Sequence, residues 1–122
     1  LLMIFFLPRI KDIIIDTFLS AKRTLTHGIK PNTFELFGFD FLIDEDFRVW
    51  LLEVNTNPYL GTPNDYLRKL VPEMLSDMLK IVVDPVMPPK VLPDTHRRNN
   101  FELVYFDARN TRDEVSINQR RQ

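Results

Sequence analysis

The sequence predicts an α+β fold in which an antiparallel β-hairpin packs against two or three helices and a disordered polar tail follows. Three observations support this prediction. Apolar residues alternate with other residues on both sides of a short acidic break, over 34–43 and 48–55. Apolar residues recur at helical spacing before this region, over 9–25, and after it, over 65–83. From residue 84 onward, prolines and polar residues replace both patterns.

The first predicted helix spans 9–25, with its apolar side chains on one face. Pro8 suits the first turn of this helix, where a missing N–H costs little. Gly28 follows the last turn and is a natural left-handed cap. The apolar run 1–7 is far shorter than the ~20 residues that a membrane span needs. We interpret it as a buried strand or the start of a helix.

The predicted hairpin turns at the polar break formed by residues 44–46. A turn centred between residues 46 and 47 fixes the cross-strand register, and an odd-length loop or a bulge would shift it. The predicted pairs are Asp40 with Glu53, Leu42 with Leu51, and Ile43 with Trp50. One face then carries only large apolar side chains, namely Phe37, Phe39, Phe41, Ile43, Trp50, Leu52 and Val54.

The opposite face of the predicted hairpin places Asp40 beside Glu53, with Asn55 two residues further along the same strand. At an effective dielectric of ~20, two unit charges ~5 Å apart repel by roughly 3 kcal/mol. Such a pair relieves its repulsion by sharing a proton, by turning into water or by holding a cation. Two carboxylates and an amide oxygen suit Mg²⁺, which also keeps phosphate and water oxygens. The alternative is a solvated strand face without a ligand.

The segment after the hairpin predicts a helix that begins with Thr62 as its cap and Pro63 at its first position. Pro72 is expected to interrupt the helix, which leaves a short helix to about residue 70 and a longer one over 71–83. The apolar stripe of this region is expected to cover the aromatic face of the hairpin together with the first helix.

The C-terminal part of the chain reads as a linker and a tail. Four prolines within 84–94 predict an extended linker. One short strand is predicted over 101–106, and the polar residues after it are expected to be disordered. The sequence therefore divides into a folded part, 1–85, and a linker with its tail, 86–122.

Composition excludes several classes of function. The net charge of −1 gives no broad basic field for nucleic acid or for an anionic membrane. The absence of cysteine excludes a disulfide framework, a thiolate metal site and a cysteine nucleophile. The three glycines form no phosphate-binding loop, and no residue stands out as a catalytic acid or base. The chain does not begin with Met, and we interpret it as a fragment.

The segments FELFGFDFLIDED and VWLLEVNTNP resemble the C-terminal part of the catalytic domain in the tubulin–tyrosine ligase-like family. The resemblance covers roughly residues 10–85. It implies an ATP-grasp domain and an ATP-dependent ligase that joins amino acids to protein carboxylates through an acylphosphate. The implied cofactors are ATP and Mg²⁺, and the matching positions for holding the metal and its nucleotide are Asp40, Glu53 and Asn55.

The same resemblance implies tubulin or microtubules as the partner, a free amino acid as the second substrate, and a cytoplasmic location at the cytoskeleton or cilium. The family adds tyrosine, glutamate or glycine, and the matched strands do not indicate which. The lysines and arginines that the family uses for nucleotide and acceptor lie upstream of these strands. The isolated chain is therefore expected to be inactive. Two alternatives remain open: a non-catalytic ATP-grasp remnant that binds tubulin, and an ATP-grasp ligase for a small metabolite or peptide.

Overall fold

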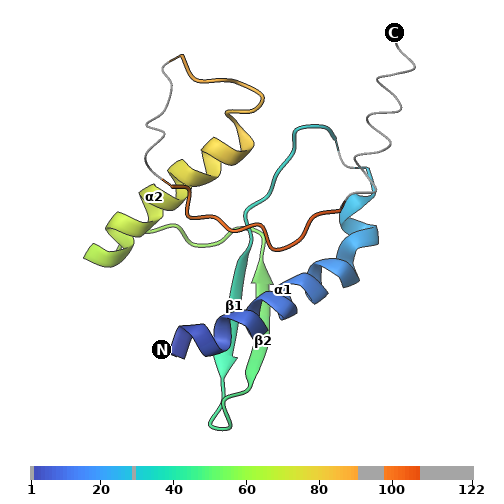
Figure 1. The fold of residues 1–122 in the computed structure, drawn as a ribbon, viewed down its shortest axis with the longest axis vertical. Coiled ribbons are helices and arrows are strands. Elements are labelled where there is room, and N and C mark those ends of the chain that lie inside the picture. The colour runs from blue at the N-terminus through green and yellow to red at the C-terminus, as the bar shows by residue number, and fades with distance from the viewer. Residues whose placement is uncertain (1, 29, 91–97, 108–122) are drawn as a thin grey trace.

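The computed structural model describes residues 2–28, 30–90 and 98–107. Its elements follow the order α1 (Leu2–Thr26), β1 (Gly38–Ile43), β2 (Val49–Asn55) and α2 (Asp65–Val82). The two strands form an antiparallel hairpin. Helix α1 runs across this hairpin, and α2 lies beyond the end of the hairpin that is opposite its turn (Figure 1). The predicted α+β class is confirmed. Neither helix among the described residues combines the length and hydrophobicity that crossing a membrane requires.

Helix α1 begins earlier than the sequence predicted, at Leu2, so that Pro8 lies inside the helix. Pro8 cannot donate a hydrogen bond to the carbonyl of Ile4. Ile4 is 78% exposed, and water can satisfy that carbonyl, which explains why the helix continues through the proline. The helix ends at Thr26, and Gly28 has a φ of +74°. The left-handed glycine after the helix is therefore confirmed.

The hairpin contains a β-bulge that the predicted register missed. Asp40 pairs with Glu53 as predicted, but the register shifts between Asp40 and Phe41. The predicted pairs of Leu42 with Leu51 and of Ile43 with Trp50 are therefore wrong. The observed pairs beyond the bulge are Phe41 with Leu51, Leu42 with Trp50, and Ile43 with Val49.

The shift exchanges side chains between the two faces of β2. Val49 and Leu51 take the half-buried positions, whereas Trp50 is 52% and Leu52 is 61% exposed. The prediction that Trp50 and Leu52 belong to the apolar face is thus wrong. The cause is a turn of odd length. Asp44 N–H donates to the carbonyl of Arg48 at 3.0 Å, so the loop between these two residues contains three residues. The predicted register assumed a loop with an even number of residues.

Phe47 occupies the last position of this turn with a φ of +60°. A left-handed conformation costs a residue other than glycine roughly 1–2 kcal/mol, and glycine is common at this place in three-residue hairpin loops. The ring of Phe47 stacks on that of Phe6 at 6.2 Å, and Phe6 is only 5% exposed. This stacking explains why an aromatic residue occupies the strained position.

Aromatic side chains join α1 to the hairpin. The ring of Phe18 lies 5.4 Å from that of Phe37 and 5.7 Å from that of Phe39, and Phe39 stacks on Phe41 at 6.2 Å. Among the side chains whose burial the structure describes, Phe6 and Val71 are the apolar ones that are at most 9% exposed. The hydrophobic core is therefore small, and the aromatic layer between α1 and the strands forms much of it.

Helix α2 differs from its prediction in three ways. Its cap is Asn64 rather than Thr62, because the Asn64 side chain accepts a hydrogen bond from Leu67 N–H at 2.9 Å. The helix is continuous through Pro72, which is exposed, so its ring displaces no packed neighbour. Packing with the hairpin is made mainly by α1, and α2 does not share the aromatic face as predicted.

Residues 98–107, which we name the return segment, pass back from α2 along α1 (Figure 1). They form neither helix nor strand, so the strand predicted over 101–106 is not observed. The polar side of the segment nevertheless makes contacts at both helices, with Asp77 of α2 and with Lys11 of α1. The linker predicted as extended over 84–94 begins instead with a turn, in which the N–H groups of Val86 and Met87 donate to the carbonyl of Val83. Asp107, the first residue of the predicted disordered tail, is ion-paired with Lys22. Residues 91–97 and 108–122 lie outside the described residues.

Candidate functional site

The three predicted site residues lie together at the end of the hairpin that leads to α2. Asp40 and Glu53 are directly paired across the strands, and Asn55 pairs with Gly38 two positions along. The side-chain amide of Asn55 donates to both carboxylates, with 3.2 Å from Nδ2 to Asp40 Oδ2 and 3.0 Å to Glu53 Oε1. The amide therefore bridges two like charges that the register would otherwise leave facing each other.

The bulge begins immediately after this carboxylate pair. A bulge bends the strand and increases its local twist, and bulges are common beside functional sites. The pair depends on this shift, because the register of the turn continued without the bulge would place Asp40 opposite Leu52. The bulge thereby restores, from Gly38 to Asp40, the register that the sequence predicts. Asp40 and Glu53 are exposed, so water and ions can reach both side chains, whereas Asn55 is half-buried.

The donor set fits a hard divalent cation that brings further ligands of its own. Within the part of the chain that the structure describes, no three His, Cys, Asp or Glu side chains gather closely enough to hold a metal. Two carboxylates and one amide therefore make up the set, and Mg²⁺ commonly takes one or two carboxylates with phosphate and water oxygens. Asn55 now points its nitrogen at the carboxylates, so coordination through its oxygen requires the amide to turn over.

The turn at the opposite end of the hairpin depends on Asp44, which sequence reasoning treated only as part of a polar break. Asp44 Oδ2 accepts from Trp50 Nε1 at 2.8 Å, and Oδ1 accepts from the backbone N–H of Arg48 at 2.8 Å and of Asp46 at 3.0 Å. These bonds, that of Trp50 first, lower the pKa of Asp44 from its ordinary value of 3.8. An aspartate opening a turn is the sequence signal that identifies this role.

The lowered pKa of Asp44 predicts that acid weakens the hairpin. A carboxylate with a depressed folded pKa stabilises the fold fully above its ordinary value, and this contribution is lost as the pH falls through the folded value. When the pH is lowered below about 4, the urea concentration at the unfolding midpoint should therefore decrease more steeply for the wild-type chain than for Asp44→Asn. Asparagine keeps an acceptor oxygen but does not titrate. Equal pH profiles for the two proteins, followed by circular dichroism, would refute this role.

Gly38 is a second residue whose role sequence reasoning missed. A Cβ at this position would lie 2.9 Å from Pro58 Cβ and 3.9 Å from Asn55 Cβ. The connection that leaves Asn55 thus crosses closely over the first residue of β1, and only glycine leaves the space. A glycine inside a strand pattern is the signal for such a close approach.

Replacing Gly38 by Ala should displace Pro58 and disturb the neighbouring Asn55, because 2.9 Å is shorter than two carbon atoms tolerate. Overpacking of this kind costs typically about 1–3 kcal/mol. Urea unfolding should show that loss, and the side-chain amide signals of Asn55 in an ¹⁵N NMR spectrum should shift. Gly28→Ala is the matched control, because nothing lies within 4 Å of its Cβ while its φ of +74° carries only backbone strain. An unmoved Asn55 signal in Gly38→Ala would contradict the close approach.

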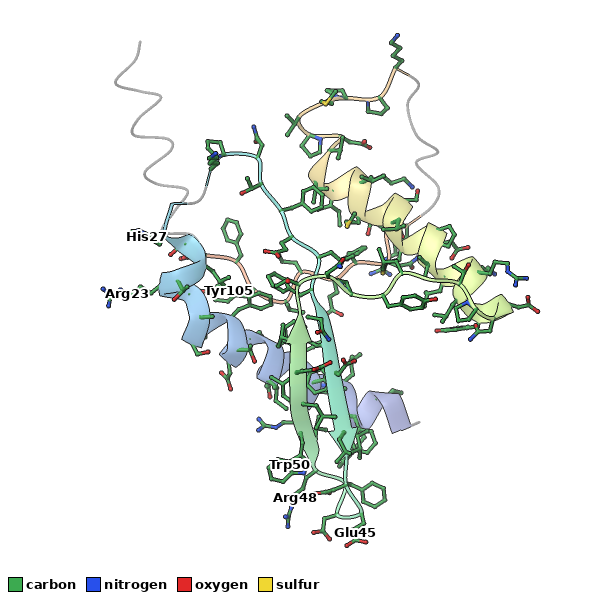
Figure 2. The ribbon with its side chains drawn as sticks, turned by 180° about the vertical axis from the view of Figure 1, so that it is seen from behind. Arg23, His27, Glu45, Arg48, Trp50 and Tyr105 are labelled. Atoms are coloured by element: carbon green, nitrogen blue, oxygen red, sulfur yellow. The ribbon has the colours of Figure 1, made fainter. Side chains whose placement is uncertain are left out.

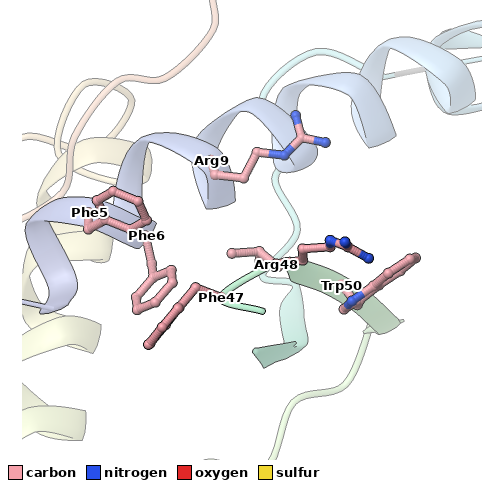
Figure 3. Close-up of a pocket in the computed structure, with 7 residues that line it drawn as sticks. Phe5, Phe6, Arg9, Phe47, Arg48 and Trp50 are labelled. Atoms are coloured by element: carbon pink, nitrogen blue, oxygen red, sulfur yellow. The ribbon is translucent and has the colours of Figure 1, made fainter. Parts of the chain in front are cut away.

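One hollow of the described surface lies away from the three site residues. It has a volume of about 490 Å³ between the start of α1 and the hairpin turn, and aromatic rings and two arginines line it (Figure 3). Its lining residues are Phe5, Phe6, Arg9, Phe47, Arg48, Val49 and Trp50. Neither carboxylate of the site reaches it. Arg48 and Trp50 lie at the turn end of the hairpin (Figure 2).

Comparison with known proteins gives one family. The family model described as the tubulin-tyrosine ligase family matches residues 6–91. Tubulin glycylase 3A of Drosophila melanogaster is 37% identical over 98 residues, which are 80% of this chain and 9% of that protein. Inactive polyglycylase TTLL10 of Homo sapiens is 41% identical over 76 residues, 62% of this chain and 11% of that protein. Tubulin polyglutamylase TTLL5 of Homo sapiens is 33% identical over 111 residues, 79% of this chain and 9% of that protein.

The chain thus spans about a tenth of the length of these curated relatives. No solved structure shows a significant match to it. The family match begins in α1 and continues through both strands and α2, so it includes the whole described site. Because that match covers well over half of the sequence, the resemblance found in the two strand motifs is confirmed, and the chain belongs to the tubulin-tyrosine ligase family.

Proposed function

We propose that this chain supplies the metal-binding strand pair of an ATP-dependent ligase that joins an amino acid to a carboxylate of tubulin. The observation that carries the proposal is the convergence of Asp40, Glu53 and Asn55, with both carboxylates within hydrogen-bonding distance of one amide. Carboxylates in this number are the usual protein contribution to a magnesium site that also binds phosphates.

In this proposal Asp40 and Glu53 hold Mg²⁺, and Asn55 adds its amide oxygen after turning over. The magnesium ion, when bound with its nucleotide, neutralises charge on the phosphate oxygens. The acceptor carboxylate then attacks the γ-phosphorus and releases ADP, and the incoming amine displaces phosphate from the acylphosphate to form the amide. None of the three residues is assigned as a general acid or base, and we assign the positioning of the acceptor to other parts of the protein.

The names of the relatives support a tubulin ligase and leave the amino acid open. One relative is named a tubulin glycylase and another a tubulin polyglutamylase, at similar identity to this chain. We accordingly propose glycine or glutamate as the added amino acid ahead of tyrosine, and the microtubule cytoskeleton as the place of action.

A second candidate is a tubulin-binding module that performs no chemistry. The observation that favours it is a relative named an inactive polyglycylase, which is 41% identical to this chain. Similarity at that level is therefore compatible with a protein that has lost activity. The two candidates differ in whether the site binds magnesium nucleotide and whether tubulin gains mass.

The deciding experiment incubates protein containing these residues with tubulin, Mg²⁺-ATP and either glycine or glutamate, and measures tubulin tails by mass spectrometry. The ligase proposal expects mass additions of one amino acid that require both ATP and Mg²⁺. Tubulin co-sedimentation without any mass addition, from protein that contains the whole catalytic domain, would instead support the binding module. Absence of both results would reject both functions.

A further inference from the structure

One face of α1 carries two lysines and, between and beyond them, apolar side chains at helical spacing: Lys11, Ile15, Phe18, Lys22 and Leu25. The return segment lies along this face. Lys11 Nζ is 2.6 Å from both carboxylate oxygens of Glu102, and Lys22 forms an ion pair with Asp107. The segment therefore contacts α1 through two acids, one at each end of the apolar stretch.

The spacing of the acids matches the spacing of the lysines. Eleven residues along a helix rise by about 16 Å, which separates Lys11 from Lys22. Five residues of extended chain cover about the same 16 Å, which separates Glu102 from Asp107. Because residues 98–107 form neither helix nor strand, no backbone ladder holds them on α1, and the register depends on these side chains.

Between the two ion pairs, Val104 and Tyr105 face the apolar part of the same helical face, with Tyr105 near the C-terminal end of α1 (Figure 2). They border a hollow of about 330 Å³ whose helical wall includes Ile15, Phe18 and Leu25. The return segment thus sits in a groove of mixed apolar and basic character and leaves part of it unfilled.

We propose that this face of α1 is a binding groove for acidic peptides, and that the return segment is its intramolecular occupant. The ligand class is an extended peptide with two acidic residues five positions apart and a large apolar or aromatic side chain between them. Such a peptide on another molecule binds by displacing the return segment. The proposal is independent of the metal site and of ligase activity.

The contacts suit exchange rather than permanent closure. The side chain of Glu102 is 65% exposed, and the side chains of Lys11 and Lys22 are 28% and 27% exposed. The exposed pair of Lys11 with Glu102 is therefore weak and screened by salt. The Asp107 side chain is only 17% exposed, so its pair with Lys22 is screened less than the first. A segment tethered to the same chain competes at an effective concentration in the millimolar range, so the occupied groove should bind external peptides weakly.

The test uses a fluorescein-labelled peptide with the sequence of residues 98–107, RNNFELVYFD, and measures fluorescence anisotropy with the full 122-residue chain. In Glu102→Lys/Asp107→Lys, like charges drive the return segment off the lysines and open the groove. This variant should bind the peptide at least about tenfold more tightly than the wild type, with an affinity that falls as salt rises. Glu102→Gln/Asp107→Asn, which removes the pairs without repulsion, serves if the first variant lacks wild-type helical circular dichroism.

The controls identify the groove. Adding Lys11→Glu/Lys22→Glu to the opened variant should abolish peptide binding. Lys30→Glu/Lys69→Glu makes the same change in net charge at exposed positions outside the groove and should preserve it. The proposal is overturned if the folded, opened variant binds the peptide no better than the wild type. It is equally overturned if both pairs of lysine substitutions reduce binding alike.

Discussion

In a protein that contains the whole catalytic domain, Glu53→Gln is expected to lower the proposed ligase activity at least about 100-fold and to weaken divalent-cation binding at least about tenfold. Glutamine retains the shape of the side chain and an oxygen that accepts from Asn55 Nδ2, which lies 3.0 Å from Glu53 Oε1. It removes one of the two negative charges opposite each other at Asp40 and Glu53. The change therefore removes attraction for a cation while it leaves the local hydrogen bonding in place.

The same substitution should slightly stabilise the metal-free chain. Two opposed carboxylates repel each other, and the repulsion is screened at this exposed position, so its removal is expected to raise the free energy of unfolding by about 0.5–1 kcal/mol. A substitution that raises the free energy of unfolding and also weakens cation binding indicates that the charge pair serves to bind a ligand rather than to stabilise the fold. Mn²⁺ titration followed by water-proton relaxation measures binding, and urea unfolding in a chelator measures stability.

Glu45→Gln is the matched control for this prediction. Glu45 is an exposed acid in the turn, at the far end of the hairpin from the paired carboxylates (Figure 2). The control makes the same chemical change and should leave both Mn²⁺ affinity and activity unaltered. Equal weakening by the two substitutions would mean that binding reflects general negative charge, and the site of Asp40, Glu53 and Asn55 would then be rejected.

Asp77→Ala should cost about 2–3 kcal/mol of unfolding free energy, the largest stability effect expected in this protein. Asp77 is fully buried, and its Oδ2 accepts from Asn100 N at 3.1 Å and from Asn100 Nδ2 at 3.2 Å. Hydrogen bonds to a charged group contribute more than neutral ones, and removing the acceptor leaves the Asn100 donors without a partner. The carbonyl of residue 77, which accepts from Asn99 Nδ2 at 2.8 Å, stays in place.

Urea unfolding monitored by circular dichroism measures this loss, and hydrogen exchange shows where it occurs. The amide of Asn100 should lose its protection in Asp77→Ala, and Asp77→Asn, which keeps an acceptor oxygen, should recover part of both properties. Asp12→Ala removes an exposed acid of α1 and should change stability by less than about 0.5 kcal/mol. Wild-type protection of Asn100 in Asp77→Ala would contradict the anchoring role of this aspartate.

The proximity of Asp40, Glu53 and Asn55 was predictable from alternation along the two strands, and their role as metal ligands stays a prediction. Alternation predicts which residues of a strand share a face. The observed odd-length turn would by itself place Asp40 opposite Leu52, and the bulge restores the predicted pairing with Glu53. Asn55 follows from alternation, since it lies two residues beyond Glu53. The left-handed Gly28 after α1 was predictable for a similar reason, because a helix end is a local event.

The bulge and the return segment were not predictable from such patterns. The register beyond Asp40 depends on a turn whose left-handed residue is Phe47 rather than glycine, so the sequence carried no signal for an odd-length loop. Helix α2 continues through Pro72 because that residue faces water, which periodicity does not reveal. The ion pair of Lys11 with Glu102 joins residues 91 positions apart, and only the folded chain brings them together.

The bulge also gives the protein a built-in optical probe. The chain contains one tryptophan, and the shifted register leaves it at the turn, half open to water, with its indole N–H bonded to a carboxylate. Indole emission responds to the charge and the wetness of its surroundings. Intrinsic fluorescence of the unlabelled wild-type chain will therefore follow the state of the turn and of the hollow that it shares with the start of α1, without any introduced dye.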